Sequence, residues 1–194
     1  MNKNEIAPGI IVYSDVIEDY STLVNDIEEG LASCKLSWIS AGTDSGINKE
    51  VRDTDSISIP FINGISEDFV DLQDAFRKSL ANIFYSTIFK LEQDYMSSFG
   101  VSFVDHDAYQ ILKYGKGQKF TNHIDDHPKY HRRVSSIYYI NDDYTGGEIN
   151  FPRFNISLKP NANQMIIFPS TYVYNHSVSP VIDGTRYSVV SWIR

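Results

Sequence analysis

The sequence of 194 residues contains a single cysteine, Cys34, so no disulfide can form within the chain. A lone cysteine is typical of a reducing compartment, and we expect a cytoplasmic protein in which Cys34 is a small buried thiol. No apolar run approaches the roughly 18 residues that a membrane span needs. Residues 1–9 also lack the apolar core of a secretory signal. We therefore expect neither export nor a membrane segment.

Basic residues are outnumbered, because 17 Lys and Arg stand against 25 Asp and Glu and give a formal net charge of −8. A negative surface repels nucleic-acid phosphates and anionic lipids, so we expect neither as a partner. Hydrophobic residues make up 42% of the chain, which excludes a disordered protein. The length suits one compact domain with its own core, and we expect a single domain over residues 1–194.

The first half of the chain carries the helical patterns. Residues 10–13 form a short β-like run, and residues 19–31 repeat apolar side chains at helical spacing up to Gly30. Residues 40–66 are polar and predict a long loop with room for one strand. Ser66 is suited to cap a second helix that runs to about Ser98, because apolar residues recur at helical spacing from Phe69 to Leu91.

After Gly100 short β-rich runs alternate with turn residues. The runs cover residues 107–114, 118–125, 133–141, 147–151, 155–159, 164–168, 172–178 and 185–193. Eight short strands at this spacing predict a two-sheet jelly roll. We expect a mainly β protein with a jelly-roll core over about residues 107–194, and helices from about residues 1–100 packed on one sheet.

Candidate metal ligands occur in two separate segments. His123 and Asp125 are two apart, so on a strand they project to the same face. His176 lies near the C-terminal end, with Arg186 ten residues after it. Two His and one carboxylate on one face of a metal form the facial triad of non-haem Fe(II) oxygenases. An Arg at a fixed offset is suited to hold the far carboxylate of a dicarboxylic co-substrate.

The remaining histidines are weaker candidates. His127 and His131 are four apart, but Pro128 opposes a helix between them, so we do not expect them to share a face. They belong to a basic loop over residues 127–133, which we interpret as a solvated turn in preference to a lip that contacts substrate. His106 is expected to lie in a loop or on the surface.

Several runs in the second half resemble prolyl 4-hydroxylases. The run Tyr109-Gln-Ile-Leu-Lys-Tyr114 followed by residues 117–125 is similar to that family's metal-binding strand pair. Residues 136–141 (Ser-Ile-Tyr-Tyr-Ile-Asn), 146–152 (Gly-Gly-Glu-Ile-Asn-Phe-Pro), 165–169 (Met-Ile-Ile-Phe-Pro) and 176–187 follow in the family's order. The resemblance covers about residues 107–194, and as an ordered set these motifs are specific.

The resemblance implies a double-stranded β-helix that binds Fe(II) and uses 2-oxoglutarate and dioxygen, with ascorbate as an expected reductant. It carries over His123, Asp125 and His176 as iron ligands and Arg186 as the partner of the C5 carboxylate of 2-oxoglutarate. Tyr114 and Tyr139 match positions that line the 2-oxoglutarate pocket, and in this fold their strands flank the strand of Arg186. In related halogenases a small residue replaces the carboxylate, so the presence of Asp125 favours hydroxylation.

Three functions follow, in order of preference. The first is a peptidyl prolyl 4-hydroxylase that acts on a proline-containing peptide or protein, with the loops over residues 40–56 and 127–133 as walls of the substrate groove. The second is a hydroxylase of a free amino acid or another small molecule. The third is a non-catalytic jelly-roll module that binds sugar or protein. Arg186 argues against this third function, because a binding module has no need of a dicarboxylate clamp.

Overall fold

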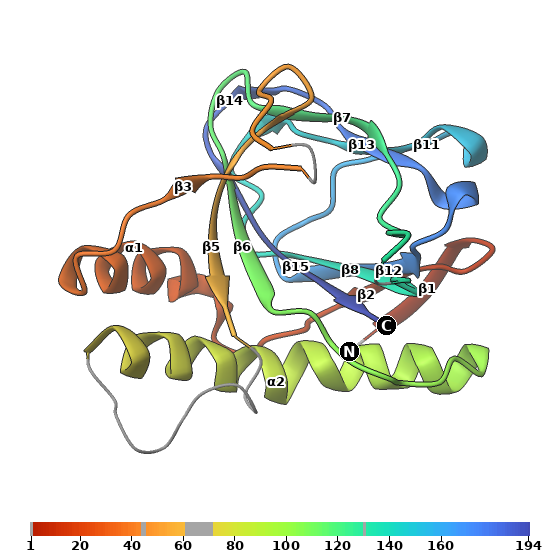
Figure 1. Ribbon diagram of the computed structural model, residues 1–194, viewed down its shortest axis with the longest axis horizontal. Coiled ribbons are helices and arrows are strands. Elements are labelled where there is room, and N and C mark those ends of the chain that lie inside the picture. The colour runs from red at the N-terminus through yellow and green to blue at the C-terminus, as the bar shows by residue number, and fades with distance from the viewer. Residues whose placement is uncertain (1, 44–45, 61–71, 130) are drawn as a thin grey trace.

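The computed structural model describes residues 2–43, 46–60, 72–129 and 131–194 as two facing antiparallel sheets with two helices (Figure 1). The larger sheet consists, in spatial order, of β1 (Asn2–Ala7), β2 (Ile10–Ser14), β12 (Gln164–Pro169), β8 (Val134–Tyr139), β15 (Arg186–Ile193), β6 (Tyr109–Tyr114), β5 (Asp55–Ile59) and β3 (Ile39–Ser40). The smaller sheet consists of β11 (Ile156–Leu158), β10 (Ile149–Phe151), β13 (His176–Val178), β7 (Lys119–His123) and β4 (Arg52–Asp53). A separate pair joins β9 (Thr145–Gly146) to β14 (Val181–Asp183).

The helices α1 (Leu23–Ser33) and α2 (Leu72–Phe99) lie along one side of the larger sheet, and the smaller sheet lies on the other side (Figure 1). Two hydrophobic cores result. On β15, Tyr187 and Val189 point into the core beside the helices, whereas Val190 and Trp192 point into the core between the sheets. Both faces of the larger sheet are therefore covered, as the predicted arrangement of helices on one sheet requires.

The two helices agree with their patterns except at their ends. Helix α1 starts at Leu23, after a 3-10 turn over Tyr20–Thr22, and continues past Gly30 to Ser33. Gly30 does not end the helix because it is a packing position. A Cβ at Gly30 would lie 2.1 Å from the Phe76 ring, so only glycine lets α2 approach so closely. The predicted cap at Ser66 lies outside the described residues.

Residues 40–60 contain more structure than the loop predicted for them. Three short strands form there, of which β5 joins the larger sheet beside β6 and β4 joins the smaller sheet beside β7. Strand β1 was also absent from the prediction, because it is mostly exposed and has no alternation of polar and apolar side chains. Strand β1 pairs only with β2, in a hairpin whose turn includes Gly9 with φ of +72°.

His106 lies in the connection between α2 and β6, as one part of its prediction had it, but it does not lie at the surface. Its side chain is fully buried, and Nε2 lies 3.0 Å from the carboxylate of Glu92 on α2. Glu92 also accepts hydrogen bonds from Ser136 on β8 and Ser191 on β15. Sequence alone does not reveal such a residue, because its polarity is satisfied by partners far away in the chain. Within the described residues, no helix is both long enough and apolar enough to cross a membrane.

Candidate metal and co-substrate site

Strands β7 and β13 bring the two halves of the proposed metal site together. They pair with His176 opposite His123, and Asp125 follows two residues after β7 ends with His123. The Nε2 atoms of His123 and His176 lie 3.5 Å and 3.6 Å from the carboxylate oxygens of Asp125. One ligand atom from each residue lies within 4.8 Å of the other two. The three side chains therefore converge on one point, as a facial triad requires.

Hydrogen bonds fix the orientation of these side chains. Nδ1 of His123 lies 2.9 Å from the Thr121 carbonyl, and Nδ1 of His176 lies 3.1 Å from the Tyr174 carbonyl. A carbonyl only accepts hydrogen bonds, so Nδ1 of each ring carries the proton. The unprotonated Nε2 then offers its lone pair to a metal. Asp125 accepts a hydrogen bond of 2.7 Å from the hydroxyl of Ser135. The neighbours thus hold all three groups in the form that binds a metal.

The charge states of the site also favour a divalent metal. Burial lowers the pKa of His176 to about 4, although the charge of Asp125 opposes this shift. Burial by itself raises the pKa of Asp125, but the two imidazoles and the Ser135 hydroxyl outweigh it and hold that pKa well below its usual range. At neutral pH the site therefore offers a neutral imidazole at His176 and a carboxylate at Asp125, as metal binding requires. Among the described residues, His123, Asp125 and His176 are the group of three or more His, Cys, Asp or Glu residues whose ligand atoms lie close enough together to hold one metal ion.

Arg186 lies at the inner end of the site, on β15 between β6 and β8. Arg186 is 1% exposed. In the sheet, Arg186 on β15 is paired with Tyr114 on β6, and Ser188 on β15 is paired with Tyr139 on β8. The Arg186 guanidinium carbon lies 4.9 Å from both tyrosine ring centres. Among the described residues no carboxylate pairs with it, and its Nε and Nη1 atoms have no hydrogen-bond partner. A buried guanidinium of this kind is suited to receive an anion.

The triad and Arg186 line one cavity, together with Leu112, Phe120, Ile137, Val178, Val190 and Trp192. This inner cavity has a volume of about 30 Å³. Most of its wall is apolar, which suits a site that excludes water.

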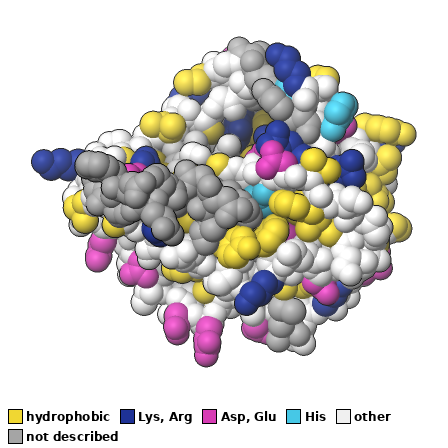
Figure 2. Space-filling view, turned by 60° about the horizontal axis from the view of Figure 1, so that its bottom comes forward, with side chains coloured by type: hydrophobic (Ala, Val, Ile, Leu, Met, Phe, Trp, Pro, Cys, Tyr) yellow, Lys and Arg dark blue, Asp and Glu magenta, His cyan; other side chains and the backbone are white. Residues whose placement is uncertain are grey.

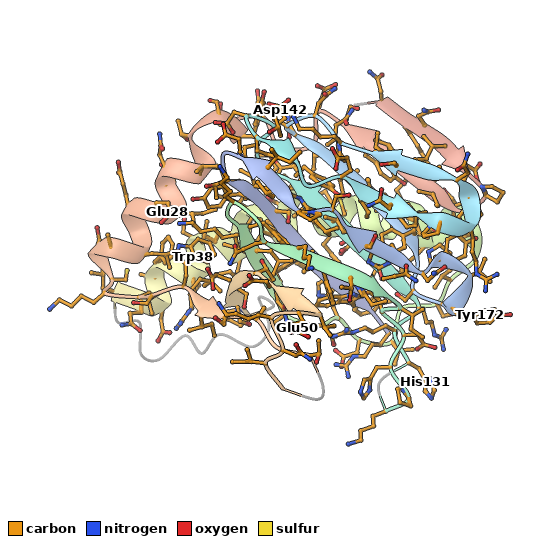
Figure 3. The ribbon with its side chains drawn as sticks, turned by 90° about the horizontal axis from the view of Figure 1, so that it is seen from above. Glu28, Trp38, Glu50, His131, Asp142 and Tyr172 are labelled. Atoms are coloured by element: carbon orange, nitrogen blue, oxygen red, sulfur yellow. The ribbon has the colours of Figure 1, made fainter. Side chains whose placement is uncertain are left out.

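A second pocket of about 500 Å³ adjoins the inner cavity and reaches the surface. It is lined by Gly42, Thr43, Val51 and Arg52 on one side, and by Asp126, His127 and Arg132 on the other. Figure 2 looks onto a face where histidine side chains lie close to basic, acidic and hydrophobic ones. In Figure 3, Glu50 and His131 mark the two loops along one edge of the molecule, and Asp142 lies at the opposite edge.

Arg52 on β4 was not predicted as a site residue. It lines both the inner cavity and the outer pocket, with its guanidinium carbon 5.0 Å from the centre of the Phe120 ring. Nη1 donates to the Gly42 carbonyl, but the buried Nε has no partner. Burial lowers the pKa of Arg52, against the opposing influence of Tyr114 and Asp125. No sequence motif marked this Arg, since only the pairing of β4 with β7 carries it to the site.

The histidines of the basic loop do not join the metal site. His131 is exposed, and the ring of His127 accepts a hydrogen bond from the backbone of Lys129. Neither belongs to the group of ligand atoms that converges among the described residues. The basic loop does contact the outer pocket through His127 and Arg132.

Comparison with known proteins agrees with this geometry. Residues 109–194 match the family model described as the 2OG-Fe(II) oxygenase superfamily. The chain is 38% identical over 84 residues to a PKHD-type hydroxylase of Prochlorococcus marinus (strain MIT 9215), a match that spans 40% of this chain and 37% of that protein.

Solved structures share the fold at low sequence identity. A prolyl hydroxylase from Trichoplax adhaerens, in complex with a hypoxia inducible factor peptide fragment, aligns with a TM-score of 0.75 and 16% identity over 95% of this chain and 83% of that one. A Pseudomonas putida prolyl-4-hydroxylase aligns with a TM-score of 0.70 and 18% identity over 96% of this chain and 92% of that one. These similarities confirm the predicted double-stranded β-helix with its helices on one sheet.

Proposed function

We propose that this chain, whose residues 109–194 match the model of the 2OG-Fe(II) oxygenase superfamily, is a 2-oxoglutarate-dependent hydroxylase that acts on prolyl residues. The observation that carries the proposal is the placement of the His123, Asp125 and His176 side chains in one cavity with Arg186, a buried cation with no counter-ion among the described residues. A purely structural metal site would not need the Arg, and a sugar-binding module would need neither.

The residues present fit the cofactors of this superfamily. His123, Asp125 and His176 would hold Fe(II), since two imidazoles and a carboxylate are its usual facial set. Arg186, flanked by Tyr114 and Tyr139, would receive the far carboxylate of 2-oxoglutarate. When bound, iron with 2-oxoglutarate and dioxygen supplies the oxidising power that places one oxygen atom into a substrate C–H bond, with succinate and carbon dioxide as the other products.

The protein's own contribution is positioning and the exclusion of water. Ser135 holds the carboxylate of Asp125 in place, and Ser170 lies 2.7 Å from the Ser135 hydroxyl and extends that support. The apolar side chains of Phe120, Val178 and Trp192 line the cavity and keep bulk water from the reacting centre. The reactive chemistry belongs to the bound group, whereas the chain fixes its geometry and charge.

A peptide is the preferred substrate because the outer pocket is open and lies between two loops. An extended chain can enter between the segment around Arg52 and the loop around Arg132. Proline-rich segments favour the extended polyproline II form, so such a substrate loses little entropy on binding. The Trichoplax adhaerens neighbour is itself in complex with a peptide. The cytoplasmic location and the use of ascorbate stay predictions.

Arg52 favours a second candidate substrate, a free amino acid or another small carboxylic acid. Among the described residues no carboxylate pairs with the Arg52 guanidinium, which lies where the inner cavity meets the outer pocket. Such a group is suited to bind the carboxylate of a small substrate. A prolyl residue inside a peptide has no such carboxylate, so the two candidates differ in how strongly they depend on Arg52.

Mass spectrometry separates the candidates. The protein is incubated with Fe(II), 2-oxoglutarate and ascorbate, together with proline-containing peptides, free proline and other free amino acids, and a gain of one oxygen is sought. We expect hydroxylated peptides. Oxygen gained on free amino acids alone would leave the oxygenase function and refute the peptide substrate.

An Arg52→Gln variant sharpens this test. It should raise KM strongly for a free carboxylic acid and only weakly for an internal prolyl residue. Lys49→Gln is the matched control, because Lys49 lies in the same segment but is exposed and pairs with Asp53.

A further inference from the structure

Two buried tyrosine hydroxyls lie beside Arg186. The guanidinium of Arg186 lies close enough to the hydroxyls of Tyr139 and Tyr144 to oppose the rise that burial causes in their pKa values. Among the described residues, however, neither hydroxyl makes a hydrogen bond of good geometry, and neither do Nε and Nη1 of Arg186. Buried polar groups are nearly always paired, and each unpaired one costs stability. Several unpaired donors around one point indicate a ligand that accepts hydrogen bonds there.

Tyr144 is held rigidly in this position. It is 3% exposed, and two glycines with positive φ lie against it, Gly147 beside its ring and Gly184 beside its Cα and Cβ atoms. A Cβ at Gly147 would lie 3.2 Å from the Tyr144 ring and 3.4 Å from Cδ of Arg186, so this glycine permits their close approach. The ring therefore has little freedom to carry its hydroxyl to solvent. Asp142, two residues earlier, marks this turn at the edge opposite the loops of the outer pocket (Figure 3).

The charge of the pocket defines what the hydroxyl can bind. Burial raises the pKa of Tyr144, and the nearby Arg186 only partly opposes this shift, so the phenol stays protonated at neutral pH and can donate a hydrogen bond. A carboxylate offers about four acceptor positions on its two oxygens. One carboxylate therefore has enough acceptors for the guanidinium and both hydroxyls, whereas a single water molecule has not.

We propose that Tyr144 donates a hydrogen bond to the distal carboxylate of 2-oxoglutarate and thereby helps to select a dicarboxylic 2-oxo acid. This inference rests on the proposed function and adds a specificity-determining residue to it. Among the described residues its hydroxyl has no other acceptor, so removal of this hydroxyl should affect the free protein and the complex with 2-oxoglutarate in opposite directions. Loss of the hydroxyl relieves an unpaired buried group in the free protein but removes a hydrogen bond to a charged group in the complex.

The test is an anaerobic titration of the Fe(II)-loaded protein, followed by tryptophan fluorescence or calorimetry, with a thermal melt of the ligand-free protein. We expect Tyr144→Phe to weaken 2-oxoglutarate binding about 10- to 100-fold. Its midpoint of unfolding without ligand should be unchanged or higher. Binding of 2-oxobutyrate, which has no distal carboxylate, should be the same in both proteins.

Tyr95→Phe is the matched control, because the Tyr95 hydroxyl is buried but donates to the Gly9 carbonyl at 2.8 Å. It should lower the midpoint of unfolding and leave 2-oxoglutarate binding unchanged. Equal affinity of the Tyr144→Phe variant and the wild type for 2-oxoglutarate would overturn this inference alone. Equal weakening of 2-oxoglutarate and 2-oxobutyrate would also overturn it, as it would indicate general damage. A wild-type protein that binds no 2-oxoglutarate would overturn the proposed function as well.

Discussion

At the scale of single residues, the candidate metal site depends on three side chains that share one point in space. Ala in place of His123, Asp125 or His176 should abolish 2-oxoglutarate turnover, because two ligands cannot hold the metal in this geometry. The fold should persist, since these side chains line a cavity. Bound iron and succinate are the quantities to measure. Full succinate production by any of the three variants would refute the assignment.

The basic loop offers controls of the same residue type for that experiment. His127 and His131 lie outside the converging group, and His131 is exposed. His127→Ala and His131→Ala should therefore retain iron and basal turnover of 2-oxoglutarate. Loss of iron from either control would show that histidine substitutions in this region act through the fold and not through the metal.

Arg186 should affect the co-substrate and not the metal. Hydrogen bonds to charged groups contribute roughly 1.5–3 kcal/mol, so Arg186→Ala should weaken 2-oxoglutarate about 10- to 150-fold. Arg186→Lys should have a smaller effect, because the charge remains and only the planar guanidinium is lost. The measurement is the dependence of succinate formation on 2-oxoglutarate concentration, with bound iron determined in parallel. An unchanged dependence in Arg186→Ala would place the carboxylate elsewhere.

At the scale of elements, Glu92 on helix α2 forms buried hydrogen bonds with residues of the larger sheet. Its buried carboxylate lies 3.0 Å from His106 and accepts hydrogen bonds from Ser136 and Ser191, and these partners hold its pKa down against the effect of burial. His106→Leu fills a similar space but leaves the carboxylate without its imidazole partner. A buried polar group left without one of its hydrogen-bond partners costs about 1–3 kcal/mol, and a charged group costs more, so this variant should be strongly destabilised. Urea denaturation measures this loss.

An exposed ion pair on the same helix is the control. Lys3 on β1 lies 2.6 Å from Asp94 on α2, and the two side chains are 38% and 47% exposed. Exposed pairs contribute up to about 1 kcal/mol, so Lys3→Ala should change the free energy of unfolding far less than His106→Leu. Similar losses in the two variants would mean that burial does not make the Glu92 cluster special.

The elements that the sequence predicted are those whose pattern is local. Eight of the strands from β6 to β15 lie in runs bounded by turn residues and were predicted near their observed bounds, whereas the short pair β9 and β14 was not predicted. Helix α2 repeats apolar residues at helical spacing, so its C-terminal end was predicted to within one residue. Strand β4 has two residues and exists only because β7 lies beside it. The predicted triad was likewise local at His123 and Asp125. The roles suggested for Arg52 and Tyr144 depend on contacts made by distant segments, which no local pattern reveals.

At the scale of the whole molecule, the N-terminal part completes the larger sheet on both sides. Strands β1 and β2 form one edge of that sheet, and β5 and β3 form the other, with the strands of the predicted jelly-roll core between them. The core beside the helices also joins side chains from both parts, such as Ile27 and Phe84 with Tyr138 and Val189. A fragment over residues 107–194 would expose two sheet edges and one apolar face, so it should aggregate and not fold.

The single domain predicted over residues 1–194 should therefore unfold in one cooperative transition. The two tryptophans provide a probe in each part, since Trp38 packs near Tyr187 in the core beside the helices and Trp192 lies in the core between the sheets. Trp192→Phe and Trp38→Phe each leave one fluorescent reporter. In each variant, the transition seen by its remaining tryptophan should coincide with the loss of secondary structure seen by circular dichroism. Separate midpoints within one variant would mean that the helical N-terminal support and the jelly-roll core unfold as independent units.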